Sequence, residues 1–170
     1  MNNDTKALLI SYIQEQFSAN SIPADNQIVV DNSRKFLTIE RIRILLTGTR
    51  WLDLLPEQIW DIRLDIYFLT AHAFYYYMPA FMTFMLNDRD HGDIMYHTFA
   101  RNLTLVYDNP KHNSRLEYII SYLTSEQKKI VVTFFEYAQQ NWLDPWDLED
   151  ENHPVNLAYK YWRSIIPMNE

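Results

Sequence analysis

Apolar side chains recur three or four positions apart along most of this 170-residue chain, which is the spacing of amphipathic helices. The first such segment follows Asp4 and Thr5, either of which can cap a helix. Its apolar positions are Leu8, Leu9, Tyr12, Ile13 and Phe17. The same spacing predicts further helices over about 38–46, 56–68, 70–87, 94–102 and 115–123, and two more that start near 124 and 154.

Polar, turn-rich stretches separate the predicted helices. Residues 18–35 predict a loop or a small isolated strand around the β-prone Ile-Val-Val at 28–30. Residues 87–93 and 108–114 predict a turn and a loop, and 141–154 predict an acidic loop with two tryptophans. Thr124 and Gln127 form a T-x-x-Q capping box, which marks the start of the helix after the second loop.

The segment 70–87 predicts a helix buried at the centre of the fold, because its apolar residues occupy all sides of a helical projection. Pro79 lies in its middle and removes one backbone donor, so a kink is expected there. The sequence shows no internal repeat and no low-complexity linker. We therefore predict one compact all-α domain over 1–170, with a kinked central helix and at most one short isolated strand pair.

Residues 67–86 contain no Asp, Glu, Lys or Arg and are long enough to cross a bilayer. Tyrosines, a histidine and a proline lie through the middle of this segment, where a lipid-facing helix would carry Leu, Ile and Val. A buried helix of a soluble protein is therefore the expectation. The amino terminus lacks the pattern of a secretion signal, and the chain has 0 cysteines, so we expect a cytoplasmic location.

Composition excludes several functions. With 2 glycines the chain has no phosphate-binding loop, dinucleotide fingerprint or nucleophile elbow, and without cysteine it has no thiol catalysis. The net charge of -7 and the absence of a basic run disfavour nucleic-acid binding, whereas a basic protein partner remains compatible. The histidines form no metal-ligand motif, so we predict no catalytic residue, cofactor or metal. A looser metal site at Asp88, Asp90, His91 or Asp93 stays open as an alternative to a solvated turn.

The tyrosine run is the first of two candidate sites. Tyr75, Tyr76 and Tyr77 are consecutive, so they span about 300° of a helix and cannot all face one core. Core packing with hydroxyls bonded at the edge is the simplest interpretation. The alternatives are a pocket at the Pro79 kink, lined by these tyrosines and His72, and a protein-binding face.

The second candidate is the acidic tryptophan loop, in which large aromatic residues alternate with acids. This composition is typical of a surface that attracts a basic partner and anchors on a buried ring. The simpler alternative is a loop whose tryptophans pack back onto the protein. The predicted interface residues are Trp142, Asp144, Trp146, Asp147, Glu149, Asp150 and Glu151.

The block FLTAHAFYYYMPAFM, preceded by WLDLLPEQIW and followed by YLTSEQKKIVVTFFEY, resembles a family of small bacterial proteins of unknown function. The shared core pattern is L-[ST]-x-x-A-F-x-Y-Y-[LM]-P-A-[FY]-M, and the resemblance covers about 36–140. Met78 stands where leucine is expected, which is a volume-conserving change. The resemblance implies no activity.

Small size, acidic charge and missing catalytic signatures suggest, by analogy, an immunity protein that neutralises a basic toxin domain. The sequence therefore predicts a non-enzymatic protein-binding protein. The alternative is a small-molecule-binding or hydrolytic helical protein with a tyrosine-lined pocket.

Overall fold

A computed structural model describes residues 3–30, 37–106 and 108–166, with the side chains of residue 3 and of 89–93 left out. These ranges form helices and connecting loops, without a β-strand, which confirms the all-α prediction. The predicted strand pair reduces to one isolated antiparallel bridge between Val29 and Leu69. The helices are α1 (Asn3–Phe17), α2 (Leu37–Leu46), α3 (Pro56–Ile62), α4 (Ala71–Asn87), α5 (Arg89–Asn102), α6 (Pro110–Tyr122), α7 (Ser125–Asn141), α8 (Pro145–Glu149) and α9 (Pro154–Ile165).

Helix α4 is the predicted central helix. Its amino terminus is capped by Thr70, whose hydroxyl accepts a hydrogen bond of 3.0 Å from the Ala73 amide. Helices α1, α3, α5 and α6 pack around it, and 12 of its 17 residues are buried. Pro79 lies buried within the helix, which continues to Asn87.

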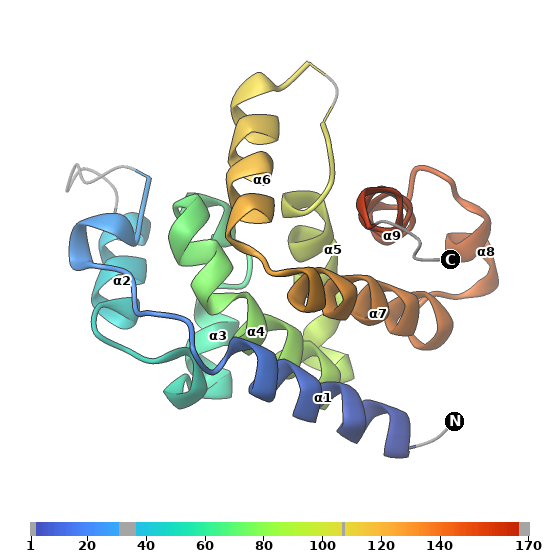
Figure 1. Cartoon of the computed structure of the whole chain (residues 1–170), viewed down its shortest axis with the longest axis horizontal. Coiled ribbons are helices and arrows are strands. Elements are labelled where there is room, and N and C mark those ends of the chain that lie inside the picture. Colours follow the sequence, from blue (N-terminus) through green and yellow to red (C-terminus); the bar gives the residue numbers. More distant parts are fainter. Residues whose placement is uncertain (1–2, 31–36, 107, 167–170) are drawn as a thin grey trace.

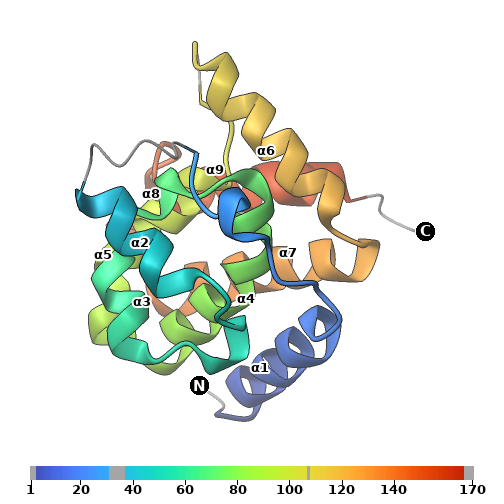
Figure 2. The same cartoon turned by 90° about the vertical axis from the view of Figure 1, so that its left-hand side faces the viewer.

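Helix α4 lies in the middle of the molecule (Figure 1). Helix α7 packs against α1 on one side and α9 on the other, and α5 also contacts α9. The amino-terminal end of α6 projects from the rest of the molecule in both views (Figures 1 and 2). Each helix of the described ranges is too short or too polar to cross a membrane.

Several predicted helix boundaries were wrong. The helix predicted over 56–68 ends at Ile62 and resumes only as a short 3-10 helix, Ile66–Phe68. Helix α5 starts at Arg89, within the stretch predicted as a turn, and α6 starts at Pro110, within the predicted loop. In α6 the cap is Asn109, whose side chain accepts from the His112 amide at 3.1 Å. A capping side chain followed by proline is a start signal that the polar composition of the loop concealed.

Candidate functional site

Two of the three consecutive tyrosines, Tyr76 and Tyr77, are buried in the core. Tyr77 is fully buried, and its hydroxyl donates to the carbonyls of Leu46 and Thr49 at 2.6 and 2.9 Å. These carbonyls flank Gly48, whose φ of 68° turns the chain sharply after α2. Burial raises the pKa of Tyr77 well above its ordinary value.

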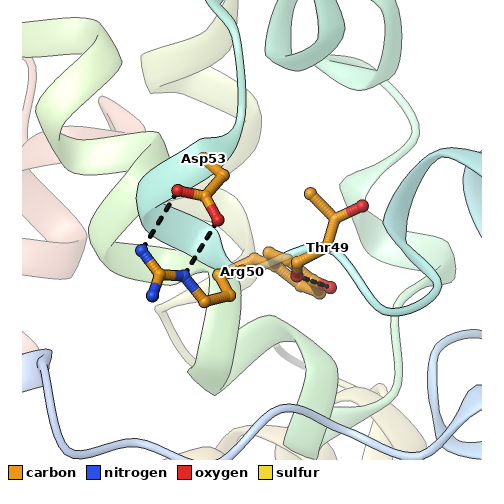
Figure 3. A network of polar contacts seen from close by, with 4 residues as sticks. Thr49, Arg50 and Asp53 are labelled. Atoms are coloured by element: carbon orange, nitrogen blue, oxygen red, sulfur yellow. Dashed lines mark hydrogen bonds and ion pairs between the residues drawn. The ribbon is translucent and has the colours of Figure 1, made fainter.

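The loop that receives the Tyr77 hydroxyl is fixed further by an ion pair at its exposed end (Figure 3). Arg50 donates from Nε and from one terminal nitrogen to the two carboxylate oxygens of Asp53, at 2.9 and 3.2 Å. This bidentate contact lies directly after Thr49 in the chain and stabilises the turn on the outer side.

Tyr75 and Tyr76 occupy different surroundings. Tyr76 is buried, and its ring forms a T-shaped pair with that of Tyr77 at a centroid distance of 4.9 Å. Tyr75 is partly exposed; its hydroxyl donates to Asn20 Oδ1 at 2.7 Å, and its ring stacks on Tyr122 at 5.4 Å. Burial raises the pKa of both tyrosines. Of the three, only Tyr75 therefore reaches the surface.

His72 is partly exposed and lies 5.3 Å from the ring of Tyr122, on the side of α4 that carries Tyr75. A hollow of about 390 Å³ does border α4 just beyond the proline, between Ala80, Thr83 and Phe84 on one side and Trp51 and Ile59 on the other. Its lining is mostly apolar and includes none of the four residues predicted for the kink pocket. The tyrosine-lined pocket stays a prediction.

The acidic tryptophan loop contains a short helix, α8, that the sequence did not indicate. Asp144 is its cap, and one carboxylate oxygen accepts from the amides of Trp146 and Asp147, both at 2.9 Å. Asp150 ends the helix, and its carboxylate accepts from the Asn152 amide at 2.9 Å. Two of the five predicted acids thus hold the local backbone in addition to carrying charge.

Asn156 of α9 fastens this segment to the body of the protein. Its side-chain amide donates to the carbonyls of Asp147, Leu148 and Asp150 at 2.8, 3.3 and 2.9 Å. Three bonds from one side chain of a neighbouring helix make α8 a fixed element beside α9 (Figure 1).

The two tryptophans of the loop differ in their packing and exposure. Trp142 packs its ring against Phe134, Tyr96 and Tyr137, at centroid distances of 5.5, 5.9 and 5.9 Å. Trp146 in contrast is 81% exposed on α8. Packing back onto the protein is therefore correct for Trp142, whereas Trp146 is accessible to a partner.

The acids differ in exposure too. Glu149, Asp150 and Glu151 are exposed, and Asp147 is partly exposed. A groove of about 880 Å³ separates Leu148 and Glu151 from α9, where Lys160 and Arg163 line the opposite wall. Four of the five predicted acids therefore lie on α8 or in the two residues that follow it.

One group of polar residues, centred on Arg115 of α6, was not predicted from the sequence. The guanidinium donates to the carbonyl of Leu69 at 3.0 Å, to Asn102 Oδ1 at 3.0 Å and to the carbonyl of Ile66 at 3.5 Å. Residues 66 and 69 precede Arg115 by more than forty positions, so no local pattern could reveal the contact.

Metal ligands do not gather in the part of the chain whose side chains are described: no group of three or more His, Asp or Glu lies close enough to hold an ion. The looser metal site considered at Asp88, Asp90, His91 and Asp93 falls largely outside the described side chains.

Comparison with known proteins yields one family. Residues 9–166 match the model described as "Family of unknown function (DUF6714)". The match extends beyond the predicted 36–140 and includes α9 and most of α1. No curated protein and no solved structure matches the chain. The bacterial origin implied by the core block stays a prediction.

Proposed function

The chain belongs to the DUF6714 family of unknown function, and we propose that it is a non-enzymatic protein-binding protein that uses α8 as its contact surface. The observation that carries the proposal is the exposure of Trp146, at 81%. An indole left in water forgoes a large gain from burial, and tryptophan is enriched among the residues that dominate binding energy.

Helix α8 is ordered before any partner arrives. The Asp144 cap and the three bonds from Asn156 fix its backbone, so binding would not have to order this segment. Preorganisation of this kind increases affinity because less conformational entropy is lost on association. Leu148, 46% exposed, adds further accessible apolar area to the same short helix.

The charge around Trp146 favours a basic partner. Glu149 and Glu151 are exposed and make no ion pair within the described side chains, and the whole chain carries a net charge of -7. Such a surface accelerates encounter with a positively charged protein and repels acidic ones. In its most concrete form, the proposal is a cytoplasmic immunity protein that neutralises a basic toxin domain.

The test is complex formation with the purified product of the neighbouring gene. Trp146→Ala should weaken binding about thirtyfold or more, as expected for a residue whose truncation costs about 2 kcal/mol. The double variant Glu149→Lys/Glu151→Lys should slow association roughly tenfold at low salt, with the difference shrinking as ionic strength rises.

A matched control is Glu15→Lys/Asp61→Lys, which changes the net charge equally at exposed positions of α1 and α3. This variant should bind nearly as the wild type does. If both double variants lose association rate equally, or if Trp146→Ala binds normally, α8 is not the contact surface.

The alternative is a small-molecule-binding or hydrolytic protein with a tyrosine-lined pocket. Its support is weaker, because the Tyr77 hydroxyl is already bonded to two backbone carbonyls and Tyr76 is buried. A screen of metabolites for a raised melting temperature, repeated with Tyr75→Phe, tests this alternative.

A further inference from the structure

Arg115 is a positive charge whose described partners are all neutral. Its three hydrogen bonds go to two backbone carbonyls and one amide oxygen. Guanidinium has five N–H donors, so the fork is not exhausted by these bonds. No ion pair involving Arg115 occurs among the described side chains, and the guanidinium carbon lies 4.9 Å from the centroid of the Phe74 ring.

The surroundings of Arg115 do not balance its charge. Burial lowers the pKa of Arg115 to about 10, and no carboxylate among the described side chains forms an ion pair with it. A partly buried cation without a counter-ion is costly to a fold, and proteins normally pair such a group. If Arg115 only linked α6 to residues 66–69, neutral hydrogen-bond donors would suffice and a positive charge would not be needed.

A cavity of about 920 Å³, widely open to solvent, lies beside this guanidinium, between α6, the start of α4 and the end of α5. Lys111 and His112 of α6 line it together with Arg115, and its lining contains no Asp or Glu among the described residues. This is notable in a chain of net charge -7. The His112 ring is held in place by a bond of 2.8 Å between Nε2 and the carbonyl of Thr104.

The rim of the cavity is aromatic. The side chains of Tyr67 and Tyr118 line it and are 51% and 63% exposed. Flat rings beside cationic side chains suit a ligand with an anionic group at one end and an organic body at the other.

We propose that this cavity binds a small organic anion, whose carboxylate or phosphate group pairs with Arg115 while Lys111 attracts it from the rim. The planar fork of arginine matches two oxygens of either group. Asn109 borders the same cavity, and its side-chain NH2 group provides a polar contact for the rest of the ligand. The site is separate from α8 and does not depend on protein binding there.

Calorimetric titration of the full chain tests the site with two probes, inorganic phosphate and benzoate, each at an ionic strength matched with sodium chloride. We expect at least one probe to bind saturably with a Kd below about 50 mM. Tighter binding of phosphate would indicate a phosphate-bearing ligand, and tighter binding of benzoate a carboxylate-bearing one. Arg115→Lys, which keeps the charge and loses the fork, should weaken that binding about tenfold or more.

Two lysine variants distinguish the loss of the binding site from the loss of the folded structure. Lys111→Glu lies in the first turn of α6, where a negative charge favours the helix, so it should weaken binding about tenfold without unfolding the protein. Lys128→Glu makes the same charge change near the start of α7, outside the cavity, and should alter the Kd less than about twofold. Absence of saturable binding, or equal losses in Lys111→Glu and Lys128→Glu, would overturn the proposal.

Discussion

The hydroxyl of Tyr77, in the middle of α4, donates to the carbonyl of Leu46, the last residue of α2, across 2.6 Å. The same hydroxyl reaches the carbonyl of Thr49 at 2.9 Å, beyond the turn at Gly48. One buried side chain thus joins the central helix to the end of α2 and to the loop that follows.

Removal of that hydroxyl should be costly. Tyr77→Phe leaves the Thr49 carbonyl without this donor, so we expect a loss of about 1–2 kcal/mol in the free energy of unfolding, measured by urea denaturation. Tyr75→Phe is the control: its hydroxyl bonds Asn20 at a partly exposed position, and its loss should be smaller. Equal losses in both variants would contradict a special role for Tyr77.

The protein should lose stability in alkaline solution. Burial raises the pKa of Tyr75, Tyr76 and Tyr77, so the folded state keeps protons that the unfolded state releases above about pH 10. Stability from these groups is complete below pH 10 and decreases as pH rises further. The contribution of Arg115 to stability changes with pH in the opposite direction, because its lowered pKa makes the folded state release this proton before the unfolded state does.

The Tyr77 contribution can be isolated by urea denaturation at several pH values. The penalty of Tyr77→Phe should shrink above pH 10 by up to about 1.4 kcal/mol per pH unit, since phenylalanine has no proton to keep. Stability curves of the two proteins that stay parallel from pH 8 to pH 12 would contradict this assignment.

Gln127 should not tolerate glutamate, although a capping box accepts either residue. Its Oε1 accepts from the Thr124 amide at 3.0 Å, while its Nε2 donates to the Gln16 carbonyl of α1 at 2.8 Å. In Gln127→Glu a buried carboxylate would face that carbonyl, and we expect a loss of about 3 kcal/mol in denaturant unfolding. Thr124→Ser retains both cap bonds and should change stability by less than about 0.5 kcal/mol. If Gln127→Glu leaves the free energy of unfolding unchanged, the contact with α1 is unimportant for stability.

The two tryptophans of the acidic loop should respond differently to truncation. Trp142→Ala removes a ring that packs on Phe134, Tyr96 and Tyr137, so we expect a loss of roughly 3 kcal/mol in thermal or urea unfolding. Trp146→Ala removes an exposed ring and should change stability by less than about 0.5 kcal/mol. The opposite order would mean that Trp146 packs against the protein in solution.

Helix starts show how far local signals reach. Thr70 and Thr124 were identified as caps from their neighbours, and both accept the expected amide. The starts of α6 and α8 were missed because Asn109 and Asp144 lie in polar stretches that resemble loops. A cap acts within one helical turn, so it can be recognised in the sequence as a capping residue followed by proline at the first helical position.

The sequence by itself determined the helical class, the buried α4 and the capping box of α7, because apolar periodicity and caps depend on residues within one or two turns. Only the tertiary structure decided which tryptophan of the acidic loop packs against the core, where the Tyr77 hydroxyl finds its acceptors and which carbonyls hold Arg115. Those acceptors lie 31 and 46 positions away along the chain for Tyr77 and Arg115. Contacts over such separations arise from helix packing, and local spacing carries no record of them.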